Sequence, residues 1–174
     1  MTDSFIEMLT VGGHTNSLGE VSRVIDSVLR DKSRLEELYS CLSADDAWVR
    51  MRAADALEKI CREHPDWLLS YVDRLMADFS SSPQPSIQWH LAQIYAEVAL
   101  TPAQKQRAMQ WMQDLLETTD VDWIASANAM KTLVQFTQEG SFPVAELRQL
   151  LVIQQKHHAK SVVRHATKFL EQLD

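Results

Sequence analysis

The apolar residues of this chain recur at helical spacing. Between Asp46 and Arg62 they follow a period of about 3.6 residues, which predicts an amphipathic helix. Asp45 and Asp46 come just before this run, where a side-chain oxygen can cap the first amide groups of a helix. The apolar face consists of Val49, Ala53, Ala56, Leu57 and Ile60. Because two of these residues are alanines, a second helix can approach this face closely.

Four positions of this face return three more times along the chain, at steps of 38, 38 and 37 residues. All of these positions are apolar. They form the rows Val49–Ile87–Ala125–Val162, Ala53–Leu91–Ala129–Ala166, Leu57–Tyr95–Leu133–Leu170 and Ile60–Val98–Phe136–Leu173. Between these helices the sequence predicts partner helices that start at or near Pro65, Pro102 and Pro143, since proline in a first helical turn costs no hydrogen bond. A repeat of about 40 residues with two helices is typical of a helical solenoid.

The part of the chain before the first repeat is expected to be helical as well. Residues 3–10 predict a short helix, and residues 20–30 and 32–42 predict a helical hairpin with a tight connection. Between them lies GGHTNSLG, residues 12–19, in which Thr15, Asn16 or Ser17 could cap a helix that begins near Leu18 or Gly19. We interpret this stretch as a capping loop, with a ligand-binding loop as the alternative, although no lysine follows in the P-loop pattern.

The segment DAWVRMRAADALEKI resembles the HEAT repeat of the HEAT/armadillo group. The residues that match the motif are Asp46, Val49, Arg50, Ala53, Ala54, Ala56 and Leu57. The later copies depart from it, with Gln88, Ser126 and Val163 in the place of Arg50. The resemblance implies an all-α fold, an α-α superhelix formed as a HEAT-like solenoid of about four helical hairpins. It also implies protein binding as the usual role.

We expect residues 1–174 to form one repeat domain, because this length is enough to bury a core. The expected division is a cap segment 1–17, repeats 18–44, 45–82, 83–119 and 120–158, and a capping helix 159–174. Cys41 and Cys61 stand twenty residues apart without metal-ligand spacing, which indicates reduced, buried thiols. The start lacks the pattern of a secretory signal and no apolar run could span a membrane, so a cytoplasmic protein is expected.

If the repeated helices line a concave surface, as the resemblance implies, their polar residues opposite the apolar face form a ridge. The residues predicted to bind a partner there are Arg52, Asp55, Trp89, His90, Gln93, Asn128, Lys131, Arg164, His165 and Lys168. Trp89 is the main candidate for an interface anchor, with packing against a neighbouring repeat as the alternative. For Trp48, Trp67, Trp111 and Trp123 we expect packing between repeat units.

The sequence shows no catalytic constellation. It lacks a glycine-flanked serine nucleophile, the glycine-rich fingerprint of dinucleotide-binding proteins and the H-E-x-x-H zinc-binding pattern. His157, His158 and His165 lack the further ligands that a closed metal site requires, so we expect neither a metal nor a cofactor.

We therefore expect a non-catalytic scaffold that binds a partner protein or peptide. The alternative is a DNA-binding protein similar to the HEAT-like alkylpurine DNA glycosylases, which hold duplex in a basic groove lined with aromatics. The net charge of −7 disfavours nucleic acid for the chain as a whole. However, residues 144–174 carry five basic and three acidic residues besides three histidines, so this end could form a local basic surface.

Overall fold

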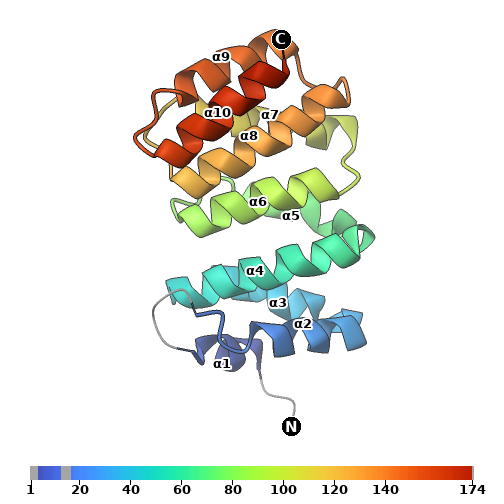
Figure 1. Ribbon diagram of the computed structural model, residues 1–174. Coiled ribbons are helices and arrows are strands. Elements are labelled where there is room, and N and C mark those ends of the chain that lie inside the picture. Colours follow the sequence, from blue (N-terminus) through green and yellow to red (C-terminus); the bar gives the residue numbers. More distant parts are fainter. Residues whose placement is uncertain (1–3, 13–16, 174) are drawn as a thin grey trace. The chain divides into compact units, whose positions relative to one another are not determined.

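The computed structural model describes residues 4–12 and 17–173, and in these ranges the chain is helical without β-strands (Figure 1). The expected all-α fold is confirmed. The α-helices are α1 (Phe5–Thr10), α2 (Val21–Arg30), α3 (Leu35–Ser40), α4 (Ala47–Glu63), α5 (Val72–Phe79), α6 (Pro85–Glu97), α7 (Pro102–Leu116), α8 (Trp123–Gln138), α9 (Val144–Gln154) and α10 (Lys160–Gln172). Shorter 3-10 turns are η1 (Lys32–Arg34), η2 (Cys41–Ser43) and η3 (Pro65–Tyr71).

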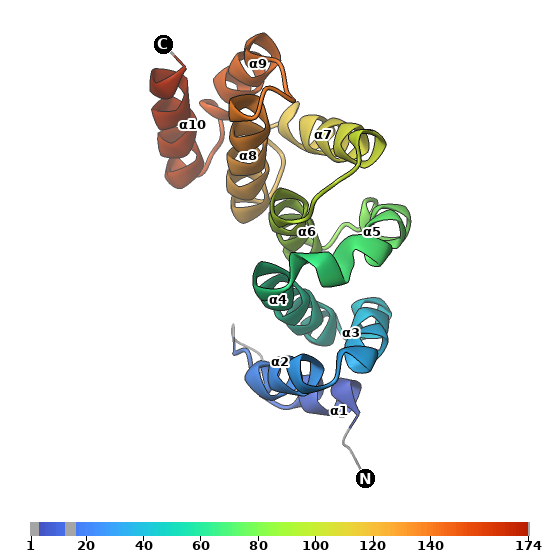
Figure 2. The same ribbon diagram turned by 90° about the vertical axis from the view of Figure 1, so that its right-hand side faces the viewer.

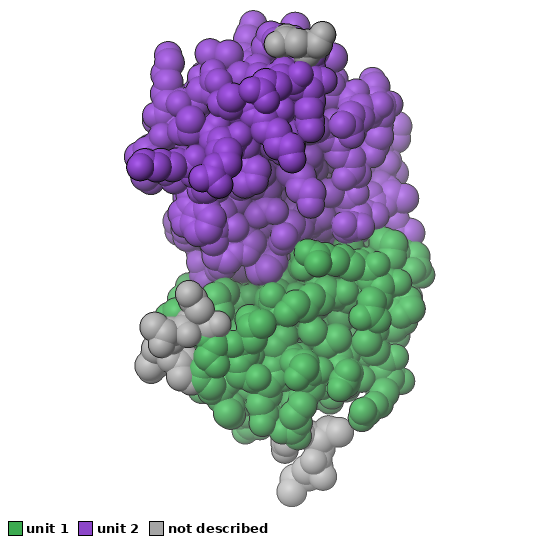
Figure 3. Space-filling view, viewed as in Figure 1, with its two compact units in different colours: residues 1–68 green, residues 69–174 purple. Residues whose placement is uncertain are grey.

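The chain divides into two compact units, Met1–Leu68 and Leu69–Asp174 (Figure 3). The boundary falls inside η3, where the sequence predicts the start of a partner helix at Pro65. The expected division into a cap, four repeats and a capping helix stays a prediction.

In the first unit, α1, α2 and α3 all pack against α4. Asp46 caps α4 as its sequence predicts, because its carboxylate accepts a hydrogen bond from the Trp48 amide at 2.7 Å. α2 begins at Val21, later than expected, and the Ser17 hydroxyl accepts from the Gly19 amide instead of capping the helix. Thr15 and Asn16, the other predicted caps, lie outside the described residues.

The two ends of the 12–19 loop touch each other. Gly12 and Gly19 both have positive φ, and a Cβ on Gly19 would lie 2.0 Å from the Val11 carbonyl oxygen. The buried Arg52 of α4 ties these ends to the helix. Its guanidinium donates to the carbonyl oxygens of Leu9 at 2.7 Å, Ser17 at 2.8 Å and Gly12 at 3.0 Å. The described ends of this loop are therefore held by glycine geometry and one arginine.

The second unit has two helical layers (Figure 2). α6, α8 and α10 lie side by side in one layer, and α5, α7 and α9 form the other. Pro102 and Pro85 occupy the first turns of α7 and α6, and Pro143 is the N-cap of α9. The Asp122 carboxylate caps α8 through the Ile124 and Ala125 amides. Proline and capping residues thus start the helices about where the sequence places them.

The predicted apolar rows are mostly buried. The row that starts at Ala53, which we call the alanine row, continues through Leu91, Ala129 and Ala166 in the second unit, and each of these residues is at most 3% exposed. Only Leu170 and Leu173 are half-exposed, because α10 contacts α8 and α9 but is followed by no further helix in the described chain. The rows therefore form the seam between neighbouring helices.

A buried polar cluster joins the layers of the second unit. The Gln154 side chain on α9 donates to the carbonyl oxygens of Leu116 and Thr118, each at 2.8 Å, and accepts from the Ser126 hydroxyl at 2.9 Å. Leu116 and Thr118 lie at and just beyond the end of α7, where helical carbonyls lack intrahelical partners. Gln154 thus connects α7, α8 and α9 through one side chain.

Candidate functional site

The layer of α6, α8 and α10 presents its polar side away from α5, α7 and α9. Because the alanine row points inward, residues on the other side of each helix point outward. On α8, Trp123, Ala127 and Lys131 are four residues apart and share one stripe. On α10 the same spacing places Lys160, Arg164 and Lys168 along one stripe. These two stripes form the core of the candidate site.

Exposure along this layer increases from α6 to α10. Trp89 and Gln93 on α6 are half-buried, as is Asn128 on α8. Lys131 and the α10 residues Arg164 and Lys168 are exposed. The gradient follows the packing, since α6 packs against α5, α7 and α8, whereas the main contacts of α10 in the described chain are with α8 and α9. The end of the layer at α10 is thus the part most open to a partner.

The outward side is basic although the chain is acidic. Together, α6, α8 and α10 carry four Lys or Arg and two Glu, whereas the whole chain has a net charge of −7. The two carboxylates, Glu97 and Glu171, lie in the last turns of their helices and are exposed. We call the outward residues of this layer the basic face, which consists of Trp89, Gln93, Trp123, Asn128, Lys131, Lys160, Arg164, His165 and Lys168.

Aromatic rings accompany these cations. Trp123 at the start of α8 is 49% exposed, a large fraction for an indole. On α10 the exposed His165 ring stacks on Phe169 with centroids 6.2 Å apart. Trp89 is tilted against His90 at 5.6 Å. The basic face therefore offers apolar ring surface next to positive charge.

Two of the predicted partner-binding residues, Arg52 and His90, are buried. Arg52 is 1% exposed because its guanidinium holds the ends of the 12–19 loop, and His90 is 8% exposed because α6 is packed on three sides. The prediction that both lie on an open ridge is wrong. Asp55 belongs to the first unit and its carboxylate pairs with Lys59 at 2.7 Å. A ridge that continues from Asp55 to Lys168 stays a prediction.

The prediction for Trp123 is also wrong, since Trp123 was expected to pack between repeat units and is 49% exposed. The repeat period could have indicated this exposure. Trp123 aligns with Pro85, 38 residues before it, and with Lys160, 37 residues after it, and it belongs to none of the apolar rows. Trp67 does contact a neighbouring expected repeat, because the Lys32 ammonium lies over its ring at 5.2 Å. Trp111 does so too, since its indole donates to the Ser80 carbonyl oxygen at 2.9 Å.

The histidines considered as ligands hold structural positions. His157 is buried, accepts a hydrogen bond from the Ala159 amide at 3.0 Å and lies 2.9 Å from the Val121 carbonyl oxygen through its other nitrogen. Its ring stacks on His158 at 4.2 Å. Both nitrogens of His157 are thus engaged with the backbone. Across residues 4–12 and 17–173, no three His, Cys, Asp or Glu residues gather in a way that could hold a metal ion.

The comparison with protein families matches residues 7–168 to the HEAT repeat domain. The chain belongs to the HEAT repeat family. It is a helical repeat protein, and such scaffolds commonly serve protein interaction. The crystal structure of an engineered protein has a similar fold, with a TM-score of 0.62 and 20% identity over 98% of this chain and 79% of that one. The comparison with curated proteins finds no match. Each helix in the described ranges is too short or too polar to cross a membrane.

Proposed function

We propose that this HEAT repeat protein is a non-catalytic scaffold that binds an acidic segment of a partner protein on its basic face. The observation that carries the proposal is the exposed Trp123 indole in the same helical layer as Lys131, Arg164 and Lys168. Tryptophan is the side chain most enriched among residues that dominate binding energy. Since its ring gives area at low entropic cost, Trp123 is suited to anchor an apolar residue of the partner.

The basic residues add selectivity to this anchor. Positive side chains around an interface attract a negatively charged partner and reject a positively charged one. The rest of this chain is strongly acidic, so a partner's acidic segment is repelled elsewhere and attracted at the basic face. A partner that alternates carboxylates with apolar side chains would use both features.

The HEAT-like DNA glycosylases remain the alternative, and the charge distribution favours a protein partner over duplex DNA. Duplex binding rests on many phosphate contacts, on the order of 6 to 10 in well-bound complexes. The outward stripes of α8 and α10 provide Lys131, Lys160, Arg164 and Lys168. A glycosylase also needs a carboxylate near its aromatic groups. The Asp122 carboxylate beside Trp123 is engaged in capping α8, and Glu97 and Glu171 lie at helix ends.

The proposal is tested with a triple variant, Trp123→Ala/Arg164→Glu/Lys168→Glu, used beside the wild type to capture proteins from native lysate. A matched control, Leu69→Ala/Arg30→Glu/Lys156→Glu, makes the same change in charge and truncates another exposed apolar residue. We expect the wild type and the control to retain the same proteins with acid-rich segments, and the triple variant to lose them. Trp123→Ala alone should weaken binding about thirtyfold or more, since dominant interface residues contribute about 2 kcal/mol or more.

Retention of the same proteins by the triple variant would refute the proposed surface. Titration of a labelled DNA duplex with the wild-type protein at about 50 mM salt tests the alternative function, DNA binding, because phosphate contacts are strongest at low salt. Duplex binding that the triple variant loses, without any retained protein, would favour the nucleic-acid function.

A further inference from the structure

The cations of the basic face have no ion-pair partner among the residues that the structure describes. On α7, by contrast, the Lys105 ammonium pairs with the Glu139 carboxylate at 2.8 Å. An uncompensated positive surface on a chain with a net charge of −7 favours an acidic partner over a neutral one. The cations without an ion-pair partner are Lys131, Lys160, Arg164 and Lys168.

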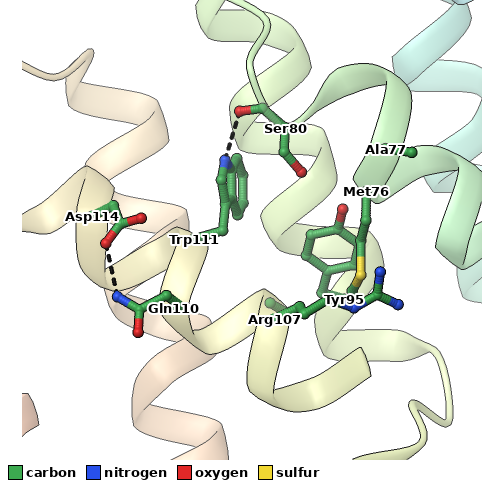
Figure 4. Close-up of a pocket in the computed structure, with 9 residues that line it drawn as sticks. Met76, Ala77, Ser80, Tyr95, Arg107, Gln110, Trp111 and Asp114 are labelled. Atoms are coloured by element: carbon green, nitrogen blue, oxygen red, sulfur yellow. Dashed lines mark hydrogen bonds between the residues drawn. The ribbon is translucent and has the colours of Figure 1, made fainter. Parts of the chain in front are cut away.

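A pocket in the other helical layer of the second unit provides a comparison. It has a volume of about 300 Å³ and opens between α5, α6 and α7 beside Trp111 (Figure 4). Neighbouring side chains engage both of its charged groups. The Arg107 guanidinium pairs with Asp73, and the Asp114 carboxylate accepts a hydrogen bond from the Gln110 amide at 2.8 Å. This pocket therefore offers a charged partner less than the basic face does.

α8 and α10 are joined at their N-terminal ends by the His157 ring. One ring nitrogen lies 2.9 Å from the carbonyl oxygen of Val121, just before α8, and the other accepts from the amide of Ala159, the N-cap of α10, at 3.0 Å. From these ends the two helices run side by side in the same direction (Figure 1). Residues one repeat period of 37 apart are therefore about level, and the pairs are Trp123 with Lys160, Ala127 with Arg164, and Lys131 with Lys168.

These three levels place an apolar group and positive charges in a fixed order. The exposed Trp123 indole lies at one end of the face, and Lys131 and Lys168 lie at the other. Between them Ala127 contributes only a methyl group, so the middle of the α8 stripe is low. Four residues advance a helix by about 6 Å. A matching partner carries an apolar side chain at one end and acidic side chains about 6 and 12 Å further on.

The helical nature of the basic face favours a helical partner segment over an extended one. An extended segment gains affinity mainly from backbone hydrogen bonds to a free sheet edge, whereas α8 and α10 use their backbone groups internally. A helix satisfies its own backbone and docks through side chains alone. In the second unit the helices α5, α7 and α9 cover the inward side of the layer, and no described helix covers its outward side (Figure 2).

We propose that the basic face binds an amphipathic acidic α-helix that packs along α8 and α10. Its apolar residue contacts Trp123, an acidic residue four positions away meets Arg164, and one eight positions away meets Lys131 and Lys168. Such a helix has the same rise of about 6 Å per four residues as the helices that it contacts. This inference rests on the proposed function and adds the conformation and the charge spacing of the bound segment.

Three labelled peptides test this inference by fluorescence anisotropy. The striped peptide is an alanine-rich helix with a leucine followed by glutamates four and eight positions later. The scrambled peptide has the same composition with the glutamates on different sides of the helix, and the broken peptide is the striped one with a central proline. We expect the striped peptide to bind about tenfold more tightly than the other two, the combined effect of a few exposed ion pairs.

A charge exchange identifies the position on the face. Arg164→Glu should weaken the striped peptide and should favour a version with lysine in place of the nearer glutamate. Arg30→Glu, an equal change of charge at an exposed position in the first unit, should leave both affinities unchanged. A striped peptide that Arg164→Glu binds as tightly as wild type does would overturn the proposal.

The outcomes separate this inference from the proposed function. Equal binding of the striped, scrambled and broken peptides would overturn the helical segment and leave an acidic partner in place. Absence of binding by all three peptides would overturn both. Displacement of the striped peptide by a DNA duplex at a lower concentration than by unlabelled striped peptide would assign the face to nucleic acid and would also overturn both.

Discussion

Replacing Gln154 by methionine tests whether one buried side chain holds the layers of the second unit together. The change keeps the length of the side chain and removes its three hydrogen bonds. The Leu116 carbonyl and the fully buried Ser126 hydroxyl then lose a partner, and the partly exposed Thr118 carbonyl regains water. Each buried orphan costs about 1–3 kcal/mol, so we expect a loss of about 3 kcal/mol in the free energy of unfolding. Compared with a typical total of about 5–15 kcal/mol, this is a large fraction.

Urea unfolding followed by circular dichroism measures this loss. Ser126→Ala supplies the control, because it removes one partner of Gln154 and leaves the two carbonyl bonds in place. Ser126→Ala should lower the free energy of unfolding less in the Gln154→Met variant than in wild type, since the Ser126 hydroxyl is already unpaired in that variant. A loss below about 1 kcal/mol for Gln154→Met would refute the reasoning, because it would mean that water or a rearranged chain satisfies these groups.

Three further predictions concern the first unit, the thiols and one ion pair. Arg52→Met should lower the free energy of unfolding by about 3 kcal/mol in urea titrations, because three carbonyl oxygens lose a charged donor; an unchanged midpoint would contradict its role. Burial raises the pKa of Cys41 to about 11, so iodoacetamide at pH 8 should label Cys41 and the buried Cys61 only after unfolding, as mass spectrometry would show. The hydrogen bond from Lys105 lowers the pKa of Glu139 below 4.5, so the pair stabilises the fold at neutral pH and this contribution is lost as the pH falls below that value. Because both side chains are partly exposed, Glu139→Gln should cost less than about 0.5 kcal/mol at pH 7, and a larger cost, or one that persists at pH 3, would contradict this.

The repeat architecture follows from local pattern, which is why the sequence was sufficient to predict it. Burial of Leu91, Ala129 and Ala166 results from one helix face that recurs at a fixed period, and Asp46 and Pro102 mark helix starts by their own chemistry. These features need no knowledge of distant contacts. The start of α2 at Val21 was less predictable, since Arg52 from another helix holds Gly12 and Ser17, the described ends of the loop before it.

The candidate site was only partly predictable because exposure depends on neighbours. Arg52 and Arg164 occupy adjacent rows of the same repeat pattern, yet Arg52 is enclosed by the ends of a loop and Arg164 lies on a helix with few neighbours. Trp123 looks like a packing residue by type, and its exposure becomes evident only when its position is compared with Pro85 and Lys160.

The most direct test of the central claim places a photo-crosslinker at one of two positions, Lys131→Cys on the basic face or Gln149→Cys on the exposed side of α9. Because Cys41 and Cys61 are buried, a thiol-reactive crosslinker should label the new cysteine alone in the folded protein. After irradiation in native lysate, we predict crosslinks from position 131 to a protein with an acid-rich segment, and none from position 149. Crosslinks from position 149 alone, or to nucleic acid from position 131, would contradict the account.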